Sequence, residues 1–244
     1  MLISIIIPVY NEEKCITSTI KEIYNFFSAR QFSFEVIVVD DCSKDQTSSI
    51  LKDLAFLYPS LRIIRSETNT GKGGSVRVGV LQSNGDYCLF MDADLSTPLN
   101  QFDYLWNEIK KNDIVIASRA LPGSVILRHQ RWVKEFIARL GNKVIRFVLG
   151  LPFYDTQCGF KIFSRKATEI FDRQTINRWG FDMEILYIAK KHQLNIAEVP
   201  VIWINDPSST VRGFDYVIVF FDVFVILFNN LLGKYNRRVR DKII

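Results

Sequence analysis

The sequence predicts an α/β protein with a mostly parallel, twisted sheet and helices on both faces of that sheet. Strand-like and helix-like stretches alternate five times before residue 118. Such β–α units fold most simply into a parallel sheet with covering helices. The first stretch, residues 2–9, is an unbroken apolar run, as expected for a strand that is buried on both faces.

The expected elements follow a regular order in the first half of the chain. Strand patterns cover residues 2–9, 34–39, 61–64, 87–91 and 114–117. Helical spacing covers residues 12–27, 47–57 and 99–111, and a glycine-rich turn at 71–74 opens a helix to about residue 82. Thr97 and Pro98 are expected as the N-cap and first residue of the last helix.

Polar residues follow these strands, at the edge where parallel sheets bind ligands. They are Asn11, Glu12, Asp40, Asp41, Asp92, Asp94, Ser118 and Arg119. The second half is less regular. Residues 128–146 are basic and amphipathic, 155–161 are polar with a glycine, 196–204 resemble a strand, and 214–232 form a strongly apolar helix before a basic end.

The net charge of +5 suits a phosphate-rich substrate or an anionic membrane surface. We expect no nucleic-acid partner, because the sequence has no basic arm and no known nucleic-acid-binding motif. The four cysteines form no C-x-x-C pair, which fits a reducing compartment and predicts no zinc site. Residues 1–9 lack the basic region of a signal peptide, so we interpret them as a strand.

The Asp92-Ala93-Asp94 motif is the sharpest chemical feature. Residues two apart at a strand end project to the same side, so the two carboxylates converge. Such a pair favours a hard divalent cation, Mg²⁺ or Mn²⁺, which in turn binds a diphosphate and stabilises its growing charge. A solvated acidic turn is the alternative interpretation.

Two other motifs are less specific. Asp40 can accept hydrogen bonds from a nucleobase or ribose, or it can cap the following helix. Residues 71–74 fail the phosphate-loop pattern, which needs glycine where Ser66 stands, and they fail the dinucleotide pattern at Val76. Neither an ATPase nor a dehydrogenase is supported.

Five motifs in order, residues 8–12, 38–45, 69–73, 92–94 and 118–119, resemble those of inverting family 2 glycosyltransferases. Residues 155–161 and 178–184 resemble dolichyl-phosphate glucosyltransferases and their bacterial and archaeal relatives more than dolichyl-phosphate mannose synthases. The resemblance spans about residues 2–212. It implies an A-type glycosyltransferase fold with a Rossmann-like nucleotide half.

The resemblance also implies roles for single residues. Asp92 and Asp94 would bind the metal and diphosphate, and Arg119 would lie near the sugar and phosphates. Ser96 stands where mannose synthases often have a metal-binding glutamine. The implied nucleotide-sugar-binding set is Pro8, Tyr10, Glu12, Asp40, Lys72, Asp92, Ala93, Asp94 and Arg119. The candidate catalytic residues are Asp94, Arg119 and Arg131.

A phosphate acceptor is already anionic, so it needs positioning and charge stabilisation rather than a strong general base. Arg128, Arg131 and Lys134 recur at spacing three and would share one face of a helix. With Arg212 they are the candidate acceptor-phosphate residues. The alternative is a solvated or phospholipid-facing basic surface. Asp155 and Asp182 are expected either to orient these arginines or to serve the structure.

Residues 213–244 are expected to form an apolar membrane-associated helix with a basic tail. Asp215, Asp222 and Asn229 recur every seven residues, which predicts a narrow polar stripe. Because Asp222 would be costly inside a bilayer, we expect the helix to lie in the membrane interface. A core helix or a dimer interface is the alternative. Residues 1–120 would form the nucleotide-sugar-binding half and residues 121–212 the acceptor half of one domain.

The predicted function is transfer of a hexose, with UDP-glucose as favoured donor, to a polyprenyl or dolichyl phosphate with inversion, at the cytoplasmic face of a membrane. The alternatives are a GDP-mannose-dependent homologue, a family 2 enzyme with a glycan acceptor, a nucleotidyltransferase, and a non-catalytic membrane protein that binds nucleotide-sugars. The oligomeric state is left open.

Overall fold

The computed structural model describes residues 1–128, 132–205 and 213–236, and of residues 128, 132–140 and 213–217 it describes the backbone alone. Its main element is a seven-stranded sheet. In spatial order the strands are β3 (Leu61–Arg65), β2 (Ser33–Asp40), β1 (Leu2–Val9), β4 (Tyr87–Met91), β7 (Phe160–Ser164), β5 (Ile114–Ser118) and β8 (Ile196–Pro200). All neighbours pair in parallel except β7, which runs antiparallel to both β4 and β5.

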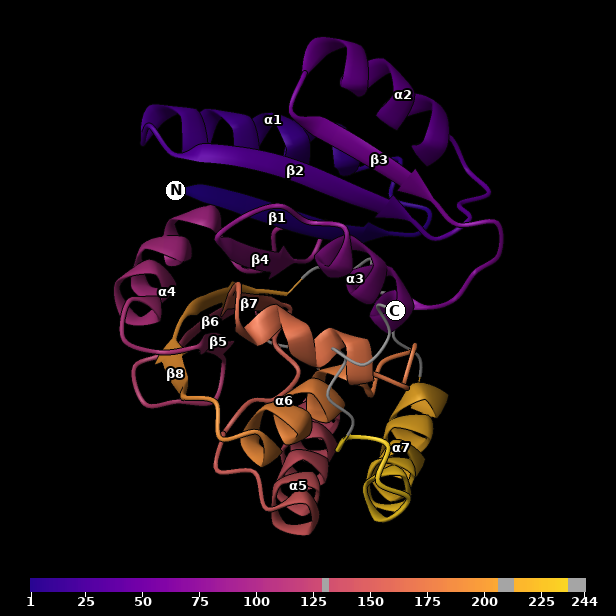
Figure 1. Cartoon of the computed structure of the whole chain (residues 1–244), viewed down its shortest axis with the longest axis vertical. Helices are drawn as coiled ribbons and strands as arrows, with labels where there is room; N and C mark the ends of the chain where they lie inside the picture. Colours follow the sequence, from indigo (N-terminus) through magenta and orange to yellow (C-terminus); the bar gives the residue numbers. More distant parts are fainter. Residues whose placement is uncertain (129–131, 206–212, 237–244) are drawn as a thin grey trace, which may run out of the picture.

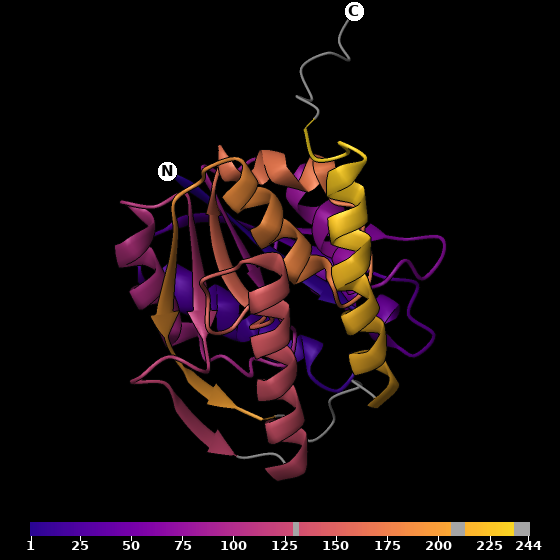
Figure 2. The ribbon, with the colours of Figure 1, turned by 90° about the horizontal axis from the view of Figure 1, so that it is seen from below.

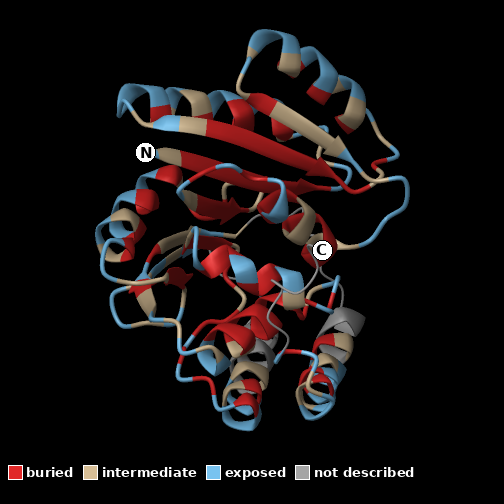
Figure 3. Cartoon of the chain, in the orientation of Figure 1, coloured by how far each residue is buried: buried red, intermediate tan, exposed pale blue. Residues whose placement is uncertain are grey.

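Helices cover both faces of this sheet (Figure 1). One core cluster joins the sheet to α1 (Ile16–Ala29), α2 (Thr47–Leu57) and α4 (Phe102–Ile109). The other joins it to α3 (Lys72–Leu81), α5 (Trp132–Leu149), the 3₁₀ helix η2 (Ala167–Arg173), α6 (Phe181–Lys191) and α7 (Gly213–Leu231). Figure 3 shows the buried strands between these exposed helices. The predicted mostly parallel α/β fold is therefore confirmed.

Alternation along β1 explains why one strand supports two cores. Ile3, Ile5 and Ile7 belong to the first cluster, whereas Ile6 belongs to the second. Successive side chains of a strand point to opposite faces, so an unbroken apolar run is what a doubly covered strand requires.

Three sequence-based assignments were wrong. Strand β7 was missed within the segment that follows residue 155. The strand expected over 196–204 is divided between β8 and β9 (Ile202–Ile204), and β9 pairs instead with β6 (Val125–Arg128) in a separate small sheet. The helix expected from residue 99 begins as a short 3₁₀ turn, η1 (Leu99–Gln101), with no side-chain cap. The Thr97 hydroxyl lies 3.8 Å from the Cys158 sulfur instead.

The basic stretch does not form one helical face. Arg128 ends strand β6, whereas Lys134 lies in helix α5, so the two residues do not share a face of one helix. Arg131 and Arg212, the other two candidate acceptor residues, lie outside the described residues. The argument from spacing is therefore wrong for Arg128, and the acceptor roles stay predictions.

Helix α7 packs beside α5, as Figures 1 and 2 show. Its Val219, Val223 and Ile226 are buried in the second core cluster. The polar stripe also faces inward: Asn229 is buried, and the Asp222 carboxylate packs against Gly180 so closely that a Cβ there would be 2.2 Å from Oδ2. Within the described residues no helix has the length and hydropathy that crossing a bilayer requires.

Asp222 makes the stability of this docking dependent on pH. Burial, and then the negative charge of Glu184, raise the pKa of Asp222 to about 6. Its Oδ2 is buried and has no hydrogen-bond partner among the residues that the structure describes. Because the folded-state pKa is raised, the stabilising contribution is complete below about pH 4 and is lost as the pH rises through about 6.

We expect Asp222→Asn to stabilise the protein at pH 8 by about 1–2 kcal/mol, a value reduced for solvent screening of a partly exposed group. At pH 5 the difference should fall to about half, because the folded carboxyl is then largely protonated whereas the unfolded carboxyl is already ionised. Urea unfolding at both pH values measures it. An equal difference at pH 5 and pH 8 would contradict the assignment.

Candidate active site

The loops that follow β1 and β2 are joined to each other at the carboxyl edge of the sheet. The Asn11 amide donates to Ser43 Oγ at 3.0 Å, and the Glu12 amide donates to Thr47 Oγ1 at 2.8 Å. Pro8 is buried within β1, and Tyr10 is 38% exposed beyond its end. Three of the predicted nucleotide-binding residues thus lie together, on a rigid support.

Asp40 and Asp41 end β2 and serve different loops. Asp40 is fully buried, and its carboxylate accepts hydrogen bonds from the Ser43 amide at 2.9 Å and from the Ser48 hydroxyl. Asp41 accepts hydrogen bonds from the amides of Thr70 and Gly71 at 2.7 and 2.8 Å. Asp41 therefore fixes the glycine turn, a role that the sequence did not reveal, and Asp40 fixes its own loop.

The glycine turn carries Lys72 to the end of β4. Gly71 has a φ of +95°, in the region that favours glycine. Lys72 Nζ lies 2.6 Å from Asp92 Oδ1, and 5.4 Å from the ring centroids of Phe90 and Trp179. Although burial disfavours the charge of Lys72, the carboxylates of Asp92, Asp182 and Asp94 raise its pKa.

The two predicted metal ligands lie at this same point. Asp92 remains 33% exposed, and a Cβ on Gly159 would lie 2.0 Å from its Oδ2. Glycine at position 159 is therefore what makes room for the Asp92 carboxylate. Asp94 Oδ1 accepts a hydrogen bond from the Ser96 amide at 2.9 Å. Burial, and then the nearby negative charge of Asp92, raise the pKa of Asp94.

A buried ion pair lies below these carboxylates. Lys161, from the missed strand β7, is fully buried and contacts Asp182 Oδ1 at 2.5 Å and the Cys158 carbonyl at 2.6 Å. Burial raises the pKa of Asp182 against the opposing charges of Lys161 and Lys72. Asp182 was expected to be structural or to orient the arginines of the acceptor set; in the described residues it pairs with lysine.

Arg119, at the end of β5, is held in one orientation by Asp155. Its Nε and Nη2 donate to the two Asp155 oxygens at 2.6 and 2.9 Å, and its amide donates at 3.0 Å. Burial opposes the charge of Arg119, but Asp155, and at longer range Asp92, raise its pKa far above the usual value. Its guanidinium lies 5.3 Å from the centroid of the Trp203 ring. Arg119 is thus a permanent cation, fixed in place.

The Asp92 and Asp94 pair fits a divalent cation. The carboxylates are hard oxygen donors whose mutual repulsion a cation would relieve. Among the described residues, no group of three or more His, Cys, Asp or Glu side chains is placed to hold a metal. Mg²⁺ commonly takes one or two carboxylates and completes its shell with phosphates and water, so a protein site of two carboxylates suits a metal that arrives with a diphosphate.

This geometry coincides with a family match. The model of the glycosyl transferase family 2 domain matches residues 4–171, which include both carboxylates, Lys72 and Arg119. The chain belongs to glycosyl transferase family 2. It is therefore a glycosyltransferase, and its A-type fold brings the carboxyl ends of β1, β2, β4 and β5 to one edge.

Similar proteins from three organisms carry the same enzyme name. The chain is 37% identical over 85% of its length to a dolichyl-phosphate beta-glucosyltransferase of Trichomonas vaginalis, of which the match covers 66%. It is 35% identical to the enzyme of that name from Dictyostelium discoideum, over 95% of this chain and 75% of the relative. The dolichyl-phosphate beta-glucosyltransferase of Homo sapiens is 34% identical, over 87% of this chain and 70% of the human protein. The chain thus spans about two thirds to three quarters of these relatives.

Solved structures share the fold at lower identity. Mannosyl-3-phosphoglycerate synthase from Rubrobacter xylanophilus superimposes with a TM-score of 0.71 at 17% identity, over 100% of this chain and 78% of that one. Glucosyl-3-phosphoglycerate synthase from Mycobacterium tuberculosis, in complex with Mn²⁺, UDP and glucosyl-3-phosphoglycerate, gives 0.65 at 21% identity, over 97% and 81%. These likenesses establish the fold.

Proposed function

We propose that this enzyme transfers glucose from UDP-glucose to a polyprenyl phosphate of the dolichyl-phosphate class, with inversion at the anomeric carbon. The names of the relatives support the sugar and the acceptor. The observation that carries the proposal is the pair Asp92 and Asp94 at the end of β4, beside Lys72 and in reach of the charge of Arg119. Two carboxylates and two cations in this arrangement suit a nucleoside diphosphate and its metal.

In this proposal Asp92 and Asp94 hold Mg²⁺ or Mn²⁺ together with the diphosphate of the donor, with Ala93 between them. A bound divalent cation supplies positive charge that stabilises the departing diphosphate. Lys72 adds a second positive charge there. Arg119, held in one orientation by Asp155, is proposed to contact the sugar or the phosphates. The proposed nucleobase and ribose contacts are Pro8, Tyr10, Glu12 and Asp40.

The acceptor oxygen attacks the anomeric carbon as the bond to UDP breaks, and the electron pair of that bond leaves with the diphosphate. Since the phosphate is already ionised, no proton has to be removed first. We retain Arg128, Arg131, Lys134 and Arg212 as the proposed acceptor-phosphate contacts, with residues 1–120 as the donor half and 121–212 as the acceptor half.

The proposal is tested by product identification. Purified full-length protein is incubated with polyprenyl phosphate, Mg²⁺ or Mn²⁺, and UDP-glucose, GDP-mannose or other radiolabelled nucleotide-sugars in separate reactions. A glucosyl lipid phosphate, with UDP as co-product, is expected from UDP-glucose. Transfer from GDP-mannose alone, release of pyrophosphate, or no turnover with any lipid phosphate would each contradict the proposal.

A lipid acceptor also requires the enzyme to reach a bilayer. The outer face of α7 is apolar and exposed, with Phe221 62%, Phe224 54% and Phe228 60% exposed, and on neighbouring α5 Phe147 is 89% exposed. We propose that this face of α7 and α5 lies in the membrane interface at the cytoplasmic side. The basic residues expected to reinforce it, 237–244, lie outside the described residues.

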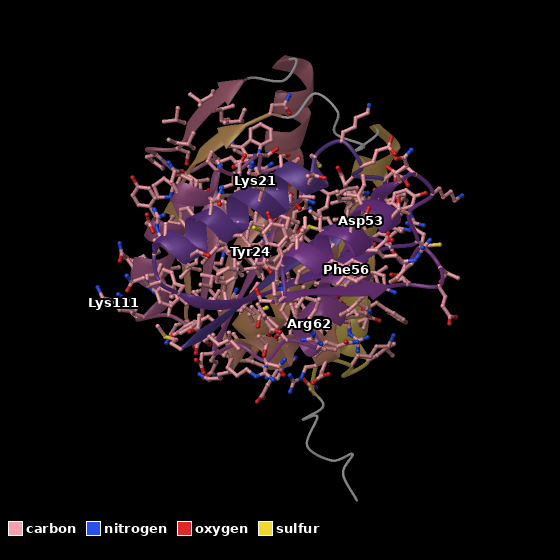
Figure 4. All side chains as sticks on the ribbon, turned by 90° about the horizontal axis from the view of Figure 1, so that it is seen from above. Lys21, Tyr24, Asp53, Phe56, Arg62 and Lys111 are labelled. Atoms are coloured by element: carbon pink, nitrogen blue, oxygen red, sulfur yellow. The ribbon has the colours of Figure 1, made fainter. Side chains whose placement is uncertain are left out.

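We expect Phe224→Ser/Phe228→Ser to reduce binding to liposomes at least about tenfold, because two aromatic side chains no longer enter the acyl boundary. Flotation with liposomes that contain anionic lipid measures it. Phe56→Ser is the matched control: Phe56 is 87% exposed on α2, at the other end of the molecule from α5 and α7 (Figures 1 and 4). Equal loss in both variants, or no binding by the wild type, would contradict membrane docking through α7.

A further inference from the structure

The inward side of α7 carries more than apolar anchors. Asn229 is buried on this side of the helix, and Tyr235 is buried in the turn that follows the helix. Asn229 Nδ2 donates to Thr175 Oγ1 at 2.9 Å, and Tyr235 Oη donates to Glu184 Oε1 at 2.7 Å. The first contact joins α7 to the segment before α6, and the second joins the turn after α7 to α6 itself.

Glu184 collects these contacts at one buried carboxylate. It is fully buried and accepts hydrogen bonds from the amides of Thr175 and Ile176 at 2.9 and 2.8 Å, and from the Thr175 hydroxyl at 2.5 Å. A buried polar network whose members are all paired fixes one arrangement of the chain, because any other arrangement leaves a polar group unpaired. The segment before α6 is therefore held by α6 on one side and by α7 on the other.

The same segment is the surface on which the glycine turn packs. Gln174 Nε2 donates to the Gly73 carbonyl at 2.8 Å, and the Gly74 amide donates to the Asn177 carbonyl at 2.9 Å. The fit leaves no space, since a Cβ on Gly73 would lie 2.5 Å from Phe181 Cβ. A shift of residues 174–181 would therefore move the turn, and with it Lys72.

We propose that Tyr235 and Asn229 are positioning residues for the donor site: through Glu184 and Thr175 they hold residues 174–181 against the glycine turn, which places Lys72 beside Asp92. This inference rests on the proposed function only in taking the Asp92 end of the sheet as the site of the nucleoside diphosphate. It gives α7 a second task beyond membrane docking, carried by its opposite face.

The test is the affinity of the full-length chain, in detergent micelles, for UDP with Mn²⁺, measured by calorimetry. Tyr235→Phe removes one hydroxyl, and Asn229→Leu removes the amide that donates to Thr175. Each is expected to weaken UDP binding about tenfold, the size expected for one lost hydrogen bond to a charged group or its partner. Tyr104→Phe is the matched control, because Tyr104 is 58% exposed on α4. Liposome flotation of Tyr235→Phe should equal that of the wild type.

A double-mutant cycle separates positioning from general loss of stability. If Tyr235 acts through Lys72, Tyr235→Phe should cost little further UDP affinity in a Lys72→Met background. Lys72→Arg replaces Lys72→Met if the latter binds too weakly to measure. The inference is overturned if Tyr235→Phe binds UDP as the wild type does, or if its loss is the same with and without Lys72. Failure of the donor site itself gives a different result, in which wild type and Asp92→Asn bind UDP equally.

Discussion

Replacing Asp92 with asparagine is expected to lower turnover at least about a hundredfold, the scale of losing a major charge stabiliser in the transition state. Asp92 is 33% exposed and contacts Lys72 at 2.6 Å, so its replacement removes a proposed metal ligand and also releases the lysine. Asp94→Asn should have an effect of similar size, because it removes the other carboxylate proposed to hold the cation and its charge.

A binding measurement accompanies the rates for Asp92→Asn and Asp94→Asn. Mn²⁺ binding in the presence of UDP, followed by electron paramagnetic resonance, should fall with turnover in both variants. Asp103→Asn is the matched control, since Asp103 is 51% exposed and pairs with Arg30 on the surface. Full activity in EDTA, or unchanged Mn²⁺ binding by Asp92→Asn, would contradict the metal assignment.

The first half of the fold could be predicted because its strands are continuous apolar runs between clear turns. Strand β7 could not, because Lys161 is its second residue and a lysine normally indicates an exposed position. Its partner Asp182 is 21 residues further along the chain, so nothing local reveals that the charge is buried and paired. Because β7 lies between β4 and β5, the order of strands in this part of the sheet could not be predicted either.

The candidate site divides in the same way. Asp92, Asp94 and Arg119 follow strand ends and could be found from the sequence, whereas their supports come from distant segments. Gly159, which makes room for Asp92, and Asp155, which orients Arg119, belong to residues 155–161, a segment whose sequence does not indicate these distant partners. Long-range pairing is what a single sequence shows least.

The polar stripe of helix α7 is compatible with two orientations of the helix, one with the stripe facing the protein and one with it facing outward. A polar residue every seven positions predicts a stripe along one side of a helix, and Asp222 and Asn229, the two members with described side chains, do lie on one side. The sequence did not say which side faces the protein. Burial of Val219, Val223 and Ile226 next to Asp222 and Asn229 directs that side inward, and leaves the phenylalanines outside.

Lys161→Met is expected to destabilise the protein by about 3–5 kcal/mol, the largest stability effect that the described ion pairs predict. Lys161 is fully buried and its ammonium contacts Asp182 and the Cys158 carbonyl. Methionine fills a similar volume but leaves the Asp182 carboxylate buried without its partner. Urea unfolding of the full-length chain, without nucleotide, measures the change.

The size of this effect should depend on the partner and on pH. Asp182→Asn in the Lys161→Met background should recover much of the loss, because no buried charge is then left unpaired. Burial raises the pKa of Asp182, so its favourable protonated form is populated at low pH and lost as the pH rises. The cost of Lys161→Met should therefore be smaller at pH 5 than at pH 8.

Lys166→Met is the matched control: Lys166 is 69% exposed where it pairs with Asp113, and such a pair contributes about 1 kcal/mol or less. Equal losses in Lys161→Met and Lys166→Met would show that the buried pair is not what holds β7 to α6 beneath the carboxylates.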